Sequence, residues 1–115
     1  MNKVDIIANP DKLERLKAEL NAIGVTGMTV TSVHGYGLQK GQQTFYRGAK
    51  AEGNLLPKVR IETIISEVPV EEVIRAARRA LYTGHVGDGK VFVSPVADAF
   101  RISNSDSGPA ALKYY

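Results

Sequence analysis

The hydrophobic period of this chain changes from two to about 3.6 and back again, and it does so twice. Residues 3–8 alternate as a short strand does, and residues 11–23 then carry Leu and Ile at helical spacing after an Asn-Pro-Asp sequence. Residues 26–34 alternate again and are rich in Thr and Val, as strands are. The first half of the chain therefore predicts a strand, a helix and a second strand.

The second half repeats that order. Residues 58–66 alternate between apolar and charged side chains, and residues 68–81 carry a helical apolar stripe. Residues 90–93 form the last clear strand, and residues 98–102 predict a short edge strand. The apolar residues that we expect in the core of this half are Val59, Ile61, Ile65, Val70, Val73, Ile74, Ala77 and Leu81.

This order of elements predicts an α+β fold of the ferredoxin-like βαββαβ type, a four-stranded antiparallel sheet with both helices on one face. At 115 residues the chain is expected to form one domain, 1–115. Lys58, Arg60 and Glu62 share the other strand face, so that face is not simply core. A bare face of mixed apolar and charged residues favours self-association with cyclic symmetry.

A long segment, residues 37–57, joins the two halves and has no clear hydrophobic period. Structureless loops of this length are uncommon inside small domains and usually carry a function. Its tip includes Tyr46, Arg47 and Gly48, and Tyr and Arg are residue types that often anchor protein interfaces. The alternative is that Phe45 and Tyr46 pack back onto the body of the domain.

A glycine-rich sequence, GHVGDGK at residues 84–90, separates the second helix from the last strand. Closely spaced glycines let backbone N–H groups approach an anion, and Lys90 adds a positive charge. The sequence differs from the P-loop pattern because its lysine opens a strand. A plain tight turn, with Lys90 in solvent, remains the alternative, and Gly35 and Gly37 alone would be read as a hinge.

Composition excludes several classes of protein. The chain has no cysteine and two histidines, which rules out disulfides and thiol catalysis and disfavours a histidine-rich metal site. No signal peptide or apolar run of bilayer length is expected, so we place the protein in the cytoplasm. The net charge of +3 is dispersed, so we expect no nucleic-acid partner and favour a small phosphate-bearing ligand. No catalytic constellation is evident, and we expect no enzyme.

Several segments together resemble the PII nitrogen-regulatory family, and the likeness covers residues 2–102. The strongest are YRGA at residues 46–49 and TGHVGDGKVFV at residues 83–93. Three other family-like segments are GVTGMTVT at 24–31, GYGLQKG at 35–41 and LPKVRIE at 56–62. The resemblance implies a homotrimer that holds ATP or ADP between its subunits.

The resemblance also implies residue roles, which we carry over as expectations. The residues that it assigns to the nucleotide are Gly27, Met28, Thr29, Gly35, Gly37, Leu38, Glu62, Ile64, Gly87, Asp88, Gly89, Lys90 and Arg101. The residues that it assigns to 2-oxoglutarate are Gln39, Lys40, Gly41 and Lys58, with Gln39 also a ligand of Mg²⁺. The residues that it assigns to a partner protein are Tyr46, Arg47 and Gly48, at the tip of the segment 37–57.

The chain also departs from the family. Ala51 stands where many members carry a tyrosine that is uridylylated, so that modification is excluded at this site. Asn9, Leu38, His85 and Ser103 stand where many relatives have basic residues near the phosphates. We therefore expect weaker triphosphate binding or a shift toward ADP or AMP. The tail, residues 103–115, differs as well.

Two functional hypotheses follow from the resemblance. The first is a nitrogen-regulatory sensor of ATP or ADP, Mg²⁺ and 2-oxoglutarate that regulates an ammonium transporter, another membrane transporter, or a nitrogen-metabolism enzyme or regulator. Such a protein would associate peripherally with the membrane through the transporter. The second is a divergent sensor of the adenylate state alone, which regulates another transporter or enzyme. An enzyme such as a slow ATPase is disfavoured because no nucleophile or base is placed to act.

Overall fold

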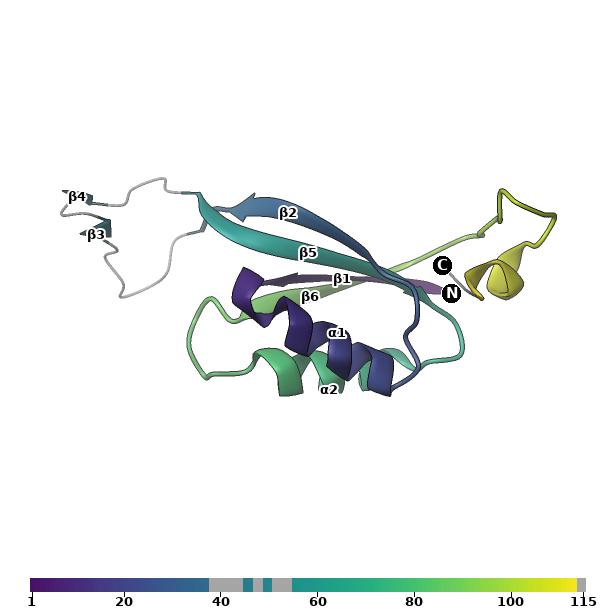
Figure 1. Ribbon diagram of the computed structural model, residues 1–115, viewed down its shortest axis with the longest axis horizontal. Helices are drawn as coiled ribbons and strands as arrows, with labels where there is room; N and C mark the ends of the chain where they lie inside the picture. Colours follow the sequence, from purple (N-terminus) through teal and green to yellow (C-terminus); the bar gives the residue numbers. More distant parts are fainter. Residues whose placement is uncertain (38–44, 47–48, 51–54, 114–115) are drawn as a thin grey trace.

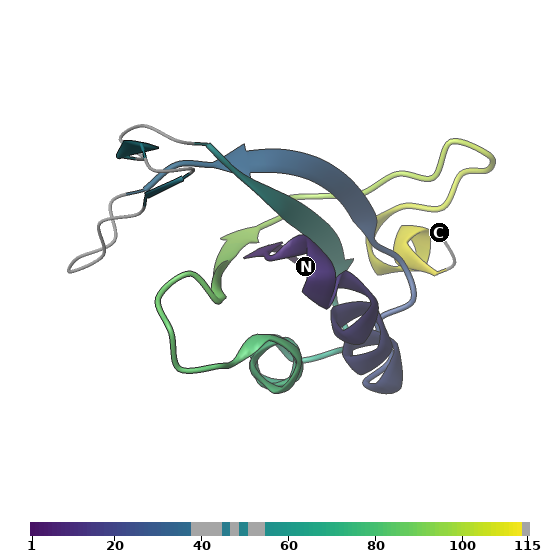
Figure 2. The same ribbon diagram turned by 60° about the vertical axis from the view of Figure 1, so that its left-hand side comes forward.

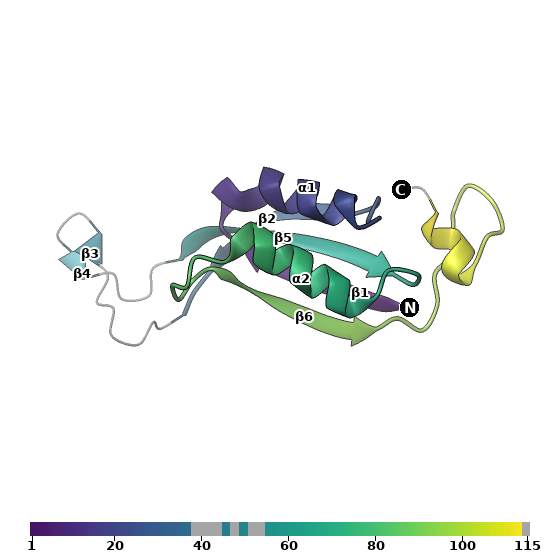
Figure 3. The same ribbon diagram turned by 90° about the horizontal axis from the view of Figure 1, so that it is seen from below.

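Four antiparallel strands form one sheet in the order β2-β5-β1-β6. The computed structural model describes residues 1–37, 45–46, 49–50 and 55–113. Both helices lie on one face of the sheet (Figures 1 and 3), as the periodicity predicts. The main elements are β1 (Asn2–Ala8), α1 (Leu13–Ala22), β2 (Thr29–Gly35), β5 (Leu56–Ile65), α2 (Val70–Leu81) and β6 (Gly89–Pro95). The ferredoxin-like architecture is thus confirmed.

The core lies between the helices and the inner face of the sheet. In the register of the central strands, Ile6 pairs with Ile61 on one side and with Val91 on the other. Ile6 and Ile61 are fully buried, as are Leu16 of α1 and Val73 of α2. Alternation along β5 places every second side chain in this core, which is why the pattern of that strand could be read from the sequence.

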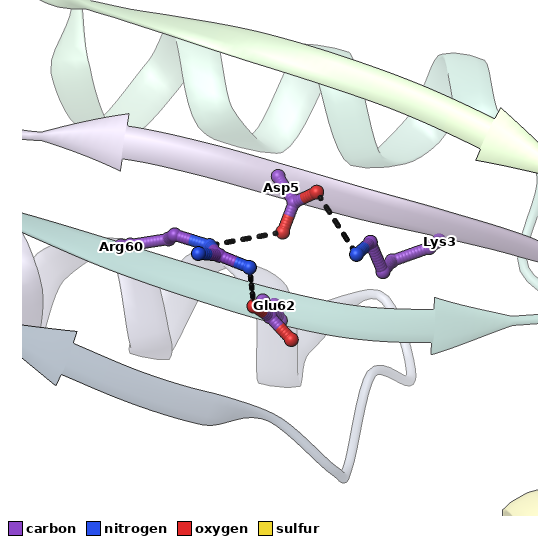
Figure 4. Close-up of polar contacts among 4 residues, drawn as sticks. All are labelled: Lys3, Asp5, Arg60 and Glu62. Carbon is purple, nitrogen blue, oxygen red and sulfur yellow. Dashed lines mark hydrogen bonds and ion pairs between the residues drawn. The ribbon is translucent and has the colours of Figure 1, made fainter.

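The outer face of the sheet carries a chain of ion pairs (Figure 4). Asp5 and Glu62 lie directly opposite each other in the register, and like charges in that position are destabilising. Arg60 offsets this repulsion because its Nε lies 3.4 Å from Asp5 Oδ1 and its Nη2 hydrogen-bonds Glu62 Oε1. Lys3 Nζ adds a pair to Asp5 at 3.6 Å. This face is therefore polar at its centre, as the charged alternation of β5 predicts.

The C-terminal region folds differently from the prediction. Residues 98–102 form no strand, and only an isolated bridge joins Phe100 to Ser107. The chain then forms a 3-10 helix, η2 (Gly108–Leu112), that the sequence analysis did not anticipate. Figure 2 shows this region at the opposite end of the molecule from the connection between α2 and β6. The prediction of an edge strand was wrong because the ladder ends at Pro95.

Other boundaries shift by a few residues. The first helical segment begins as a 3-10 helix, η1 (Pro10–Lys12), before α1. Strand β2 begins at Thr29 instead of residue 26. The segment 37–57, expected to lack structure, contains a short antiparallel pair of β3 (Phe45–Tyr46) and β4 (Ala49–Lys50). Neither helix in the described part of the chain combines the length and apolar character needed to cross a bilayer.

Replacing Ile61 tests the assignment of the core. The Ile61→Ala variant should lower the free energy of unfolding by about 2–5 kcal/mol, because it leaves a cavity where the side chain is fully enclosed. Chemical denaturation at fixed protein concentration measures this change. The control is Ile102→Ala, at a side chain that is 98% exposed, which should change stability far less. Equal effects of the two substitutions would contradict the assignment.

Candidate functional site

The glycine-rich turn between α2 and β6 is closed by one carboxylate. Asp88 Oδ2 accepts hydrogen bonds from the backbone N–H groups of Thr83 at 2.6 Å and Gly84 at 3.0 Å. The Thr83 hydroxyl donates to Asp88 Oδ1, and the Asp88 N–H donates to the carbonyl of His85 at 3.4 Å. Asp88 therefore shapes the turn from inside, and its oxygens are already occupied by donors of the same chain.

These hydrogen bonds lower the pKa of the Asp88 carboxyl below its ordinary value of 3.8. The largest cause is the hydrogen bond from the Thr83 side chain, followed by the bond from the Thr83 backbone. The Gly84 N–H and the His85 charge act in the same direction, while partial desolvation opposes them. The carboxylate thus stays ionised at physiological pH and keeps the turn closed.

Gly89 is required where the turn enters β6. A Cβ at this position would lie 2.3 Å from the backbone oxygen of Ile7 in the neighbouring strand, far inside van der Waals contact. Its φ of +139° is also one that residues with side chains rarely adopt. Gly87 has a φ of +104°, so both glycines are needed for the backbone path. The close approach brings the turn directly against the end of β1.

The carbonyl of Gly87 joins the turn to two other elements. It accepts hydrogen bonds from Lys58 Nζ at 3.2 Å and from Asn9 Nδ2, also at 3.2 Å. Lys58 Nζ further donates to Asn9 Oδ1, which closes a triangle of three hydrogen bonds. Asn9 follows β1, Lys58 lies near the start of β5, and Gly87 precedes β6. These three hydrogen bonds therefore fix the turn to β1 and β5, the two central strands of the sheet.

A pocket of about 330 Å³ lies beside this triangle. The Lys90 ammonium in its wall has no hydrogen bond or ion pair within the described residues. A Cβ at Gly35 would lie 3.2 Å from Lys58 Cγ, so the glycine lets the lysine stem pass close to the end of β2. The predicted site residues that line this pocket are Gly35, Gly37, Lys58, Gly87, Gly89 and Lys90. We call it the turn pocket. Its apolar lining residues include Ile7, Leu56, Val86 and Phe92.

A second pocket, of about 380 Å³, contains two other predicted residues, Gly27 and Ile64. We call it the tail pocket because residues of the C-terminal region form part of its wall. The Thr63 hydroxyl, in a side chain that is 3% exposed, donates to the Gly27 carbonyl at 2.7 Å. This bond fixes the segment before β2 against the end of β5. The two pockets share no lining residue.

The remaining predicted nucleotide residues lie in different surroundings. Met28 is partly buried against the core, and Thr29 opens β2 opposite Glu62. Arg60 donates a hydrogen bond to Glu62, so the Glu62 carboxylate already has a partner within the chain. Arg101 lies in the C-terminal region, where its guanidinium hydrogen-bonds backbone carbonyls. The single chain thus brings together six residues at the turn pocket and two at the tail pocket.

Part of the predicted site lies outside the described residues. These positions are Leu38, Gln39, Lys40, Gly41, Arg47 and Gly48. Tyr46 is described only as a backbone position of β3. Among the described residues no group of three or more His, Cys, Asp or Glu could hold a metal ion.

Asn9 is the functional residue that the sequence analysis missed. From the sequence, Asn9 was read as part of the Asn-Pro-Asp sequence before the first helix and as the loss of a basic residue near the phosphates. In the structure its amide both donates to Gly87 and accepts from Lys58, which a basic side chain could not do. The only local signal for this role is that Asn9 lies between a strand and a Pro. The same pattern is typical of an ordinary helix N-terminus, so it does not indicate the role.

Acid titration tests the role of Asp88. The depressed pKa means that its contribution is complete above the unfolded-state value, near 3.8, and is lost as the pH falls through the lower folded-state value. The amide resonances of Thr83 and Gly84 should therefore shift with a midpoint below 3.8 in an NMR titration. In Asp88→Asn the same resonances should already differ at neutral pH. A midpoint above 3.8 would contradict the closure of the turn by the carboxylate.

Known proteins resemble this chain in sequence and in fold. The family model "Nitrogen regulatory protein P-II" matches residues 1–106. The chain is 46% identical over 112 residues to the nitrogen regulatory PII-like protein of Bacillus subtilis, covering 97% of each chain. It is 44% identical to the nitrogen regulatory protein GlnK of Escherichia coli K12, covering 97% of this chain and 100% of the relative.

Two solved structures of B. subtilis GlnK superpose on the chain with a TM-score of 0.80 each. The one described as a GlnK–ATP complex is 41% identical and the other 43%. The alignments cover 96% of this chain and 94% and 97% of those chains, respectively. The relatives are named as regulatory proteins, which confirms the expectation that the chain is not an enzyme. The chain belongs to the nitrogen regulatory protein P-II family.

Proposed function

We propose that this P-II protein binds ATP or ADP in a site shared between two copies of the chain, and that the occupied site regulates a partner protein through the segment 37–57. The observation that carries the proposal is the division of the predicted residues between two pockets. Gly27 lies before β2 and Gly35 is the last residue of this seven-residue strand, so the extended strand keeps them roughly 20 Å apart. A second copy that presents its tail pocket to the turn pocket would join the two halves.

The turn pocket suits the phosphates. Gly87 and Gly89 keep side chains away from the backbone, and Lys90 offers an ammonium that has no protein partner among the described residues. Asp88 is held inside the turn by its own hydrogen bonds and so repels an incoming anion less than a free carboxylate would. The tail pocket suits the base, because it offers backbone edges and apolar walls of a size that accepts a small ligand. The name of the GlnK–ATP complex supports nucleotide binding by a near relative.

A cyclic trimer is the assembly that we propose. A contact of tail pocket to turn pocket joins two different surfaces, and such a head-to-tail contact closes into a ring when the rotation permits. The outer face of the sheet supports it, since the ion pairs among Lys3, Asp5, Arg60 and Glu62 make a half-buried polar centre beside the exposed Phe92. Three such faces could cover one another around an axis.

2-Oxoglutarate is proposed to bind at Lys58. The ammonium donates to Asn9 and Gly87, so one of its three donors remains for a carboxylate. The described residues of the turn pocket offer ammonium groups and no carboxylate, and they do not fit a metal held by the protein alone. Mg²⁺ would thus depend on Gln39, outside the described residues, and on oxygens of the ligands.

The segment 37–57 is proposed to report occupancy to the partner. Gly35 and Gly37 before it and Lys58 after it all line the turn pocket, so a ligand there contacts both ends of the segment. A ligand that favours one arrangement of those ends shifts the population of segment conformations. The partner that we propose is an ammonium transporter, contacted through Tyr46, Arg47 and Gly48, with the protein otherwise in the cytoplasm. The alternative is an adenylate sensor of another transporter or enzyme, which Leu38 and Ser103, in place of basic residues, leave open.

Mixing two defective variants tests the shared site. Thr26→Trp should block the tail pocket and Lys90→Glu should repel phosphate, so each variant alone should lose most ATP and ADP binding. Mixed, unfolded and refolded together at equal amounts, they should recover about a quarter of the wild-type sites, because a head-to-tail contact then pairs two intact halves by chance. Isothermal titration calorimetry counts the sites and light scattering gives the trimer mass. No recovery in mixed trimers would place the site within one chain.

Titration with 2-oxoglutarate separates the two functional alternatives. In the presence of Mg-ATP the wild type should bind 2-oxoglutarate, and Lys58→Met should weaken that binding at least about tenfold by removing the charged partner of a carboxylate. Lys3→Met, a lysine of the outer face that is paired with Asp5, is the matched control and should leave 2-oxoglutarate binding near wild type. Nucleotide binding without any 2-oxoglutarate binding by the wild type would instead support the adenylate sensor.

A further inference from the structure

Basic side chains that are dispersed along the sequence gather at one end of the molecule, together with exposed tyrosine and aliphatic side chains. We propose that this end, which we call the turn end, is a docking surface for an anionic lipid bilayer. This role goes beyond the proposed function and rests on it only for the trimeric assembly. The surface exists only in the fold, because segments that are far apart in the sequence contribute to it.

The register of the sheet defines the turn end. Ala8 pairs with both Val59 and Gly89, and Gly35 pairs with Leu56. The ends of β1 and β2 therefore lie beside the starts of β5 and β6. Helix α1 begins and helix α2 ends at this same end of the molecule (Figures 1 and 3). The turn end comprises residues 9–15, 35–37, 55–58 and 78–90.

Three cationic side chains of the turn end have no hydrogen bond or ion pair with another described residue. These are Lys12, Arg15 and Arg78. Arg15 and Arg78 are exposed, and Lys12 is half-buried. Lys90 is unpaired as well, but it lines the turn pocket, where we propose that it binds phosphate. The other three cations are therefore free to attract a second anionic partner.

Carboxylates of the same region do not neutralise these cations. Glu14 and Glu19 each form an ion pair with a different basic residue, at 3.1 and 2.9 Å. The Asp88 oxygens accept hydrogen bonds from within their own turn. Asp11 is exposed and has no ion pair within the described part of the chain. Lys90 aside, the turn end thus has three unpaired cations against this one unpaired carboxylate.

Side chains at the opposite end of the molecule have the reverse balance. Glu67 and Glu71 are exposed there and pair with no other described residue. Lys113, in the C-terminal region, is the unpaired cationic side chain at that end. An anionic surface would therefore attract the turn end more strongly than the opposite end, and it would orient the molecule.

Exposed aromatic and aliphatic side chains accompany the cations of the turn end. The large ones are Tyr36, Leu55, Tyr82 and Val86, and Tyr82 is 76% exposed. Tyrosine is favoured at the interface of a bilayer, because its ring packs among the lipids and its hydroxyl stays in water. Cations beside exposed apolar side chains are typical of proteins that lie on a membrane surface. This combination favours a bilayer over an acidic protein surface, which would need the cations alone.

The proposed trimer would multiply the contact. A rotation about one axis cannot reverse a direction along that axis, so the three turn ends would face the same side. Three weak contacts to one plane act together, because the first contact raises the effective concentration of the other two. Attraction of basic residues to an anionic bilayer falls within a Debye length. We therefore expect salt-sensitive binding that requires no transporter.

Flotation with lipid vesicles tests the docking surface on the full chain, without transporter or nucleotide. At low salt the protein should float with vesicles that contain phosphatidylserine and not with phosphatidylcholine alone, and the bound fraction should fall as salt rises. The double variant Arg15→Glu, Arg78→Glu should bind at least about tenfold more weakly. Tyr82→Ser should weaken vesicle binding about threefold and leave binding to soluble heparin unchanged, since heparin offers no apolar interface.

Two acid-to-lysine variants locate the surface at equal net charge. Asp11→Lys, at the turn end, should strengthen vesicle binding at least about fivefold, whereas Glu71→Lys, at the opposite end, should stay within about twofold of the wild type. Equal effects of the two variants, or equal binding to anionic and neutral vesicles, would overturn the docking surface.

Calorimetry with ATP and ADP on the same protein keeps this inference apart from the proposed function. A wild type that binds nucleotide but no vesicles would overturn the docking surface alone. A wild type that binds anionic vesicles but no nucleotide would overturn the proposed function alone.

Discussion

The candidate site depends on one backbone carbonyl, which ties together three elements of the fold. The oxygen of Gly87 accepts hydrogen bonds from Asn9 and from Lys58, and the two donors also bond each other. Three elements that are distant in sequence thereby become one rigid corner. The glycine-rich turn would otherwise be a loop tied only at its ends. The triangle fixes the Lys58 ammonium, and Lys58 and Lys90 line the same pocket.

The second constraint is the length of β2. The residues before and after this strand belong to different pockets, and a rigid seven-residue strand keeps them apart. In the site that we propose, a ligand that contacts both pockets lies across a boundary between two copies. Such a site couples ligand binding to assembly, because each copy contributes a different half. It also places the ends of the segment 37–57 against the ligand, so the same contacts that bind it can bias that segment.

Much of the fold could be read from the sequence, but the site could be read only in part. The alternation in β5 predicts which residues are buried, and Val59, Ile61 and Ile65 are all in the core. The glycine-rich turn was recognised because positive φ values and a close backbone approach require glycine there. The course of the chain after Pro95 could not be predicted from the sequence. It depends on hydrogen bonds from Arg101 to carbonyls 10 and 12 residues further along the chain. No local period encodes such a contact.

The sequence by itself determined the order of strands and helices, the buried face of each, and the place of the glycine-rich turn. These features arise from interactions between residues a few positions apart, and periodicity records them. The tertiary structure alone decided that Asn9 would meet residues 49 and 78 positions away, and that the predicted nucleotide residues would fall into two separate pockets. Hydrogen bonds over such separations depend on the register of the sheet, which brings distant residues together. The residue type at one position does not indicate which distant residue it will contact.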